Sequence, residues 1–201
     1  MMLKPLHFTG AFLGTYAGVL ACQHGTFEIL QGPVAPGGLM IQAIGPPCQP
    51  EAVWHGCFPA MTLIPNLLIS GYATLVAGLL VIRWSAFFLA RRHGGLVLAL
   101  FALLLLPVGG GFVPVLIGVV AGVAASRLDA TPKPAGPGWR LLAHLWPWAL
   151  LLMAVWFPGS WLLGYFFNQA MLATGGVLFL FFDIALPVLT ALGGVARQKI
   201  T

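Results

Sequence analysis

Charged side chains are scarce in this chain of 201 residues. Only 6% of its residues are charged, with nine Lys and Arg against four Asp and Glu, whereas a soluble domain carries about 25%. That scarcity excludes a surface that faces water throughout. Apolar residues make up 60% of the chain and the mean hydropathy is +0.98. We therefore predict an all-α, polytopic membrane protein that forms one membrane domain over residues 1–201, with the lipid bilayer as its main partner.

The motifs of common enzyme classes are also missing. The sequence has no phosphate-binding glycine loop, no Gly-x-Ser-x-Gly elbow and no His-Glu-x-x-His metal helix. Its three cysteines include no Cys-x-x-Cys pair, which argues against disulfide-exchange catalysis. We expect no cofactor and no metal. The formal charge of +5 sets the orientation in the membrane, and we do not expect nucleic-acid binding.

Long apolar runs are abundant, and they divide the chain into spans. A span takes about 20 apolar residues. The first run resembles a signal peptide at its start, but Leu20 fits a lipoprotein cleavage site poorly, so we interpret it as a membrane helix. We predict four full spans, at 8–30, 60–84, 141–157 and 172–193. A central broken or re-entrant hairpin covers 96–126, an outer loop covers 32–59 and a cytoplasmic linker covers 127–140.

The basic residues lie at the ends of these runs, which predicts the topology. The loop 32–59 contains no Lys or Arg, as is typical of a translocated segment, whereas Arg91 and Arg92 follow the second span. Lys4 precedes the first span and Lys199 follows the last. We therefore predict that both termini are cytoplasmic, in the cytoplasmic membrane of a bacterium or archaeon.

The segment 96–126 is too long for one comfortable span, and both of its ends are basic. Residues 107–114, Pro-Val-Gly-Gly-Gly-Phe-Val-Pro, interrupt it at its middle. Each arm then has roughly 11 to 13 residues, or about 16 to 20 Å of helix, which is short of a hydrocarbon core of roughly 30 Å. We expect other helices to surround the turn, because unpaired backbone amides are costly in lipid.

Three polar residues near the outer end of the first span form a candidate binding site. His24, Glu28 and Gln31 are spaced to share one helix face. Ionisable groups in a span are costly and usually serve ion, proton or substrate handling. The alternative is a local pair in which His24 is hydrogen-bonded to Glu28.

Asp183 is the second candidate, because apolar residues surround it on both sides along the chain. We expect it to face inward and to bind a ligand. Pro187, four residues later, leaves the carbonyl of Asp183 without its usual helical donor. The alternative is a protonated aspartate that only specifies helix packing.

Small residues recur every four positions along the first span, at Gly10, Gly14, Gly18, Cys22 and Thr26. Such a smooth face lets another helix approach closely. The pattern does not separate packing inside the chain from docking, so we predict that Gly10, Gly14 and Gly18 contact either another helix of this chain, a second copy or another membrane subunit.

The outer loop holds Cys48 and Cys57, nine positions apart. We predict a disulfide between them, since the outer side of such a membrane is oxidising. A metal site formed by Cys48, His55 and Cys57, with Glu51, is the weaker alternative.

Three functions are compatible with these features. The first is a small membrane protein with an intramembrane polar site, formed by His24, Glu28, Gln31 and Asp183, that binds or translocates a small solute, proton or lipid. The second is a non-catalytic subunit of a larger membrane complex. The third is a membrane-embedded enzyme on a lipid or quinone, with His24 and Glu28 as acid and base.

Overall fold

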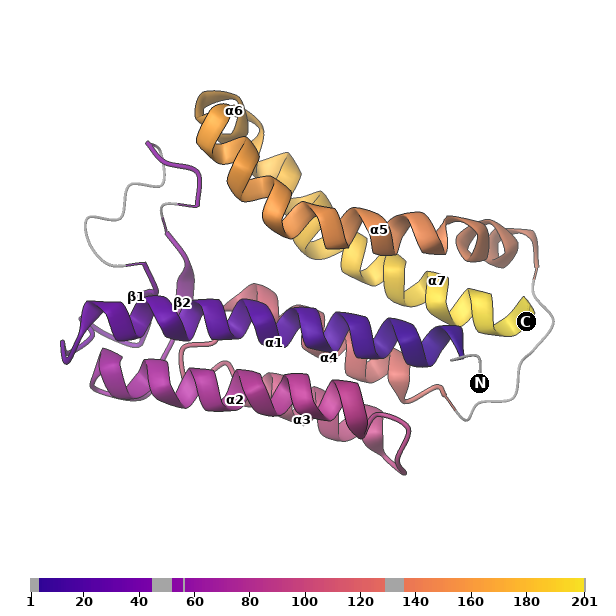
Figure 1. Cartoon of the computed structure of the whole chain (residues 1–201), viewed down its shortest axis with the longest axis horizontal. Coiled ribbons are helices and arrows are strands. Elements are labelled where there is room, and N and C mark those ends of the chain that lie inside the picture. Colours follow the sequence, from indigo (N-terminus) through magenta and orange to yellow (C-terminus); the bar gives the residue numbers. More distant parts are fainter. Residues whose placement is uncertain (1–3, 45–51, 56, 129–135, 201) are drawn as a thin grey trace.

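The computed structural model describes residues 4–44, 52–55, 57–128 and 136–200. The described chain is helical apart from one short two-stranded sheet (Figure 1). Its elements in chain order are α1 Pro5–Gln31, β1 Met40–Gln42, β2 Pro59–Met61, α2 Leu67–Phe87, α3 Gly94–Leu104, α4 Phe112–Ala125, α5 Pro137–Phe166, α6 Asn168–Leu178, the π-helical segment η1 Phe179–Ala185 and α7 Leu186–Ile200.

Three helical stretches are long and apolar enough to cross a membrane. They are α2, α5 and the continuous run of α6, η1 and α7 from Asn168 to Ile200. This finding supports a membrane protein. The predicted first span is also a long helix, α1, although it is not among these three. Its glycine, threonine and ionisable residues lower its hydropathy. Many of them are buried, because α1 packs against α2, α4 and α7.

The glycine ladder of α1 packs against helices of the same chain. A side chain at Gly18 would lie 2.7 Å from the carbonyl oxygen of Gly78, and one at Gly14 would collide with Ser85, both on α2. Gly10 lies against Leu89 and against Ala125 of α4. A docking partner at this face stays a prediction, and such a partner would have to displace α2.

The predicted central break is present. α3 and α4 are helices of 11 and 14 residues that pack against each other, and a turn over 105–111 joins them. The three glycines of the turn are buried. Gly109 and Gly111 have φ values of +106° and +79°, a left-handed conformation that favours glycine. The turn is enclosed by protein, as expected from the cost of bare amides in lipid.

The second span begins later than the predicted residue 60. Residues 59–61 form strand β2, which pairs antiparallel with β1 so that Ile41 faces Ala60. Helix α2 then begins after Asn66, whose side chain accepts a hydrogen bond from the amide of Ile69 at 3.1 Å and caps the helix. Its strands have only three residues each, which is too short for an alternating pattern to predict them from the sequence.

Helix α5 is longer than the predicted 141–157. It continues through both Pro147 and Pro158 to Phe166, although a break after Phe157 was expected. In lipid a helix satisfies its own backbone groups, so one that contains proline is less costly than an irregular segment. The predicted span 172–193 likewise lies within the longer stretch Asn168–Ile200.

The basic residues gather at one end of the bundle. Figure 1 places the start of α1, the end of α7, the α2–α3 connection and the start of α5 at the same end, and the strands with α6 at the other. Lys199 there lies 3.8 Å from the ring centre of Trp139, and Arg91 lies 4.7 Å from that of Phe88. The start of α1 and the end of α7 therefore lie at the same end of the bundle, and the cytoplasmic side for this end stays a prediction.

Candidate functional site

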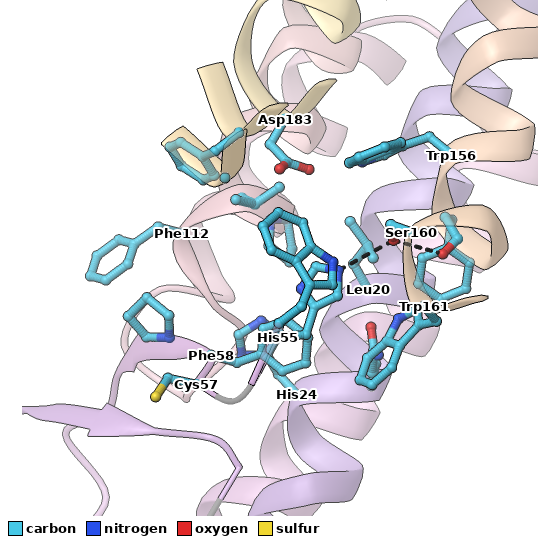
Figure 2. Close-up of a pocket in the computed structure, with 18 of the residues that line it drawn as sticks. Leu20, His24, His55, Cys57, Phe58, Phe112, Trp156, Ser160, Trp161 and Asp183 are labelled. Carbon is cyan, nitrogen blue, oxygen red and sulfur yellow. Dashed lines mark hydrogen bonds between the residues drawn. The ribbon is translucent and has the colours of Figure 1, made fainter. Parts of the chain in front are cut away.

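A cavity of about 420 Å³ lies between α1, the end of the outer loop, α4 and the arm formed by residues 137–200 (Figure 2). Its wall is largely aromatic. The aromatic members are Tyr16, Trp54, Phe58, Phe112, Trp156, Phe157, Trp161 and Phe179. The polar, non-aromatic members of the wall are Gln23, His24, His55, Ser160 and Asp183. Two of the four predicted site residues, His24 and Asp183, thus line one cavity, whereas Glu28 and Gln31 are not among its described lining residues.

His24 lies between the cavity and the glycine turn. Only 6% of it is exposed, and its Nδ1 atom forms no hydrogen bond with a described residue. Its ring lies 5.2 Å from that of Phe58. On another side, a side chain at Gly111 would come within 2.5 Å of the ring. The missing Cβ of Gly111 therefore gives the imidazole its space.

Glu28 lies one helical turn beyond His24 and packs against the same glycine turn. It is fully buried, and neither carboxyl oxygen has a hydrogen-bond partner among the described residues. A side chain at Gly109 would collide with the carboxyl group, at 2.2 Å from Oε1. His24 and Glu28 are consequently not hydrogen-bonded to each other, which argues against the local pair that the sequence left open.

Hydroxyl groups of α2 satisfy the backbone of the glycine turn. The carbonyl of Val108 accepts hydrogen bonds from Ser70, at 2.8 Å, and from Thr74. The amide of Leu63 donates to the carbonyl of Pro107 at 2.8 Å. These hydroxyls were not among the predicted site residues, although serine and threonine within an apolar span are a recognisable signal for contact with irregular backbone.

Asp183 lies in the π-helical segment η1, half-buried at the cavity wall beside Trp156 (Figure 2). The amide of Leu186 donates to the carbonyl of Phe181, five residues earlier. Such wide turns are frequent at functional sites. Pro187 has no amide hydrogen to donate to the carbonyl of Asp183, which favours a departure from the α-helical pattern at this point. The ring of Phe182 stacks on Trp156 at 3.7 Å and joins η1 to α5.

The outer loop is attached to the arm by a contact that the sequence analysis missed. The amide of Trp54 donates to Oδ1 of Asn168 at 2.8 Å, and Nδ2 of Asn168 donates to the carbonyl of Ala52 at 2.7 Å. The indole of Trp54 fits against Gly164 and Gly175, where a Cβ would come within 2.4 and 2.9 Å of it. We call these residues the latch. Tryptophan in a Gly- and Pro-rich loop was the available signal.

His55 and Ser160, both in the cavity wall, are hydrogen-bonded to each other, with 3.2 Å between Nε2 and Oγ. Ser160 also donates to the carbonyl of Phe157 at 3.1 Å. A hydroxyl has one hydrogen to donate, so when Ser160 donates to Phe157, Nε2 of His55 is the donor to Ser160. Burial lowers the pKa of His55 to about 4, which keeps the imidazole neutral at pH 7. A lone serine in an apolar run was the signal for this contact.

The other predicted site residues lie elsewhere. Nε2 of Gln31 donates to the carbonyls of Gln42 and Ala43, so Gln31 holds α1 to strand β1. Cys57 lines the cavity. Cys48 and Glu51 lie outside the described residues, and the predicted disulfide and the alternative metal site with His55 stay predictions.

The chain was compared with family models, curated proteins and solved structures. No family model, no curated protein and no solved structure matches it.

Proposed function

We propose that this chain is a membrane-embedded binding protein whose cavity takes a small, mostly apolar molecule with a polar end. One observation carries the proposal: His24 of α1 and Asp183 of η1, far apart in sequence, line one cavity of about 420 Å³. Small-molecule pockets typically have 300 to 1,000 Å³ and combine apolar walls with a few polar groups. The first of the three functions, binding or translocation of a small solute or lipid, is therefore the best supported.

The wall chemistry narrows the class of ligand. Aromatic rings from the loop, α4, α5 and η1 suit an apolar body of ring or chain type. No Lys or Arg is among the described lining residues, and phosphate recognition usually depends on such groups. The imidazole of His24 and the carboxyl of Asp183 suit a hydroxyl, carbonyl or amine instead. The polar end of the ligand is thus neutral or basic.

The topology that goes with this function has α1 as a fourth full span and α3–α4 as a re-entrant hairpin. With the basic end of the bundle in the cytoplasm, the cavity lies toward the outer side of a bacterial or archaeal cytoplasmic membrane. The loop that covers the cavity would then meet an oxidising compartment, where a Cys48–Cys57 disulfide would stiffen it.

The test is whether the protein retains a molecule when it is purified. The protein is prepared in mild detergent, extracted with organic solvent and examined by mass spectrometry. We expect a stoichiometric small amphipathic molecule, and we expect Leu20→Trp, which fills the cavity from α1, to lose it. Val19→Trp is the matched control, because Val19 is 40% exposed on the same helix and does not line the cavity.

The same preparation distinguishes the alternatives. Equal retention in Leu20→Trp and in the wild type would overturn binding in this cavity. A companion chain that co-purifies in fixed ratio, with no small molecule, would instead favour the non-catalytic subunit. The enzyme with His24 and Glu28 as acid and base is less favoured, because Glu28 is not among the described residues of the cavity wall.

A further inference from the structure

The Glu28 carboxyl is a second polar feature, separate from the cavity wall. It is fully buried and contacts Gly109 of the hairpin turn. A buried carboxylate ordinarily has hydrogen-bond donors or a cation beside it, because an isolated charge is very costly away from water. Neither oxygen has a hydrogen-bond partner among the described residues.

Among the described residues, Ser70 is the hydroxyl close enough to the Glu28 carboxyl to stabilise its charge in part. However, the hydroxyls of Ser70 and Thr74, on the facing helix, both donate to the carbonyl of Val108, so their hydrogens are committed. The turn contributes glycines, which carry no charge. The helix ends and connections that hold the described Lys and Arg residues gather at the opposite end of the bundle (Figure 1). A neutral carboxyl avoids the cost of an unpaired charge in this place.

His24 is the titratable side chain that shares the turn with Glu28. It lies one helical turn away, packs against Gly111 and also lines the cavity. Its Nδ1 has no hydrogen-bond partner among the described residues, so the imidazole can accept a proton. Among the described residues it is therefore a titratable group that contacts both the glycine turn and the cavity.

We propose that Glu28 is a proton-binding site, neutral at pH 7, and that it exchanges its proton with the cavity through His24. The hairpin turn between two half-helices encloses the site, as irregular backbone encloses the ion sites of some transporters. The site does not depend on the cavity ligand, so either proposal can fail without the other.

Infrared spectroscopy of the purified protein tests the protonation state. A protonated carboxylic acid has a carbonyl stretching band that an ionised carboxylate lacks. We expect the difference spectrum between wild type and Glu28→Gln at pH 7 to contain this band, and the corresponding difference for Asp183→Asn serves to separate the two acids. A difference spectrum with only carboxylate bands at Glu28 would overturn the proposal.

A second measurement does not depend on the folding of a variant. A membrane-soluble carbodiimide reacts with a protonated carboxyl. The carboxyl proton adds to one nitrogen of the carbodiimide and the carboxyl oxygen adds to its central carbon, so that one C=N bond becomes single. The adduct then rearranges to a stable acylurea. We expect peptide mass spectrometry to find wild-type Glu28 modified at pH 7, with the modification declining as the pH is raised. An unmodified Glu28 across that range would contradict a proton site.

Deuterium exchange tests the route. In D₂O the carbonyl band of Glu28 shifts as its proton is replaced. We expect His24→Phe, which keeps a ring of similar size, to slow this shift. His7→Phe is the matched control on the same helix, since His7 also has a buried Nδ1 without a described partner, and it should leave the rate unchanged. Equal rates in His24→Phe and wild type would overturn the role of His24.

Discussion

The α1–α2 pair and the arm of residues 137–200 are assembled by different means. α1 and α2 meet through glycines, and a Cβ at Gly25 or Gly71 would lie within 2.7 Å of the opposing backbone. The arm contacts α1 and α4 mainly through α7, and it leans away from α1 toward the end that holds the strands (Figure 1). Aromatic rings and the latch join the two regions there. The α1–α2 interface is tightly packed, whereas the interface between α1 and the arm leaves space for the cavity.

The largest expected effect on stability comes from placing a large side chain between α1 and α2. In Gly71→Leu the new side chain meets the carbonyl oxygen of Gly25 and the backbone of Ile29, and a backbone cannot move aside as a side chain can. We expect a loss of about 3 kcal/mol or more in the free energy of unfolding, measured by thermal unfolding in detergent. Gly176→Leu is the matched control, because nothing lies within 4 Å of that Cβ position. Equal losses in both variants would contradict the comparison.

The latch should matter less, and only locally. Asn168→Ala removes two hydrogen bonds, to Trp54 and Ala52, for a loss of about 1 to 3 kcal/mol. We expect faster hydrogen exchange in residues 52–58 and unchanged exchange in α1 and α2. Thr174→Ala, on the same helix and with one local bond, is the control. Faster exchange throughout the bundle in Asn168→Ala would show that the two regions unfold together.

Acid should also weaken the attachment of the outer loop to the arm, with a smaller loss of stability than Asn168→Ala causes. The folded protein lowers the pKa of His55 to about 4 through burial, below the ordinary value of about 6.5. The unfolded loop therefore binds more protons between these values, and the stability due to neutral His55 is complete above pH 6.5 and is lost as the pH falls toward 4.

We expect proteolysis in residues 52–58 to increase over that range in the wild type. The dependence should be weaker in His55→Phe, which cannot titrate at that position. A wild-type loop whose cleavage is the same at pH 7 and at pH 4.5 would show that burial of His55 does not hold the loop in place.

The sequence predicted the helices better than it predicted the site. Apolar runs and the Pro-Val-Gly-Gly-Gly segment are local signals, and they indicated α1, the hairpin and the helical return of the chain to its basic end. The continuation of α5 through Pro158 was not predictable in this way, because it depends on the absence of water around the helix.

Within the candidate site, helical spacing grouped His24, Glu28 and Gln31, but these residues face three different environments. A helix face spans a wide arc, and tertiary contacts decide what each part of it meets. That His24 and Asp183 line one cavity depends on how the arm packs against α1. The partners of Trp54 and His55 lie more than 100 residues away in the chain, and a single sequence carries no sign of such pairs.

The smallest expected effect is a gain in stability, and it provides a further comparison between the two regions. Gly176 is a helical glycine on α6 with open space around its Cβ position. Gly176→Ala should therefore stabilise the protein by about 0.5 to 1 kcal/mol, because alanine restricts the unfolded chain and favours the helix. Gly25→Ala, by contrast, places its methyl group 2.7 Å from the carbonyl oxygen of Gly71 and should destabilise. Thermal unfolding of both variants in the same detergent measures whether each is more or less stable than the wild type. A stabilising Gly25→Ala would mean that α1 and α2 can separate slightly at no cost, and the closed interface would then not be what distinguishes this pair from the arm.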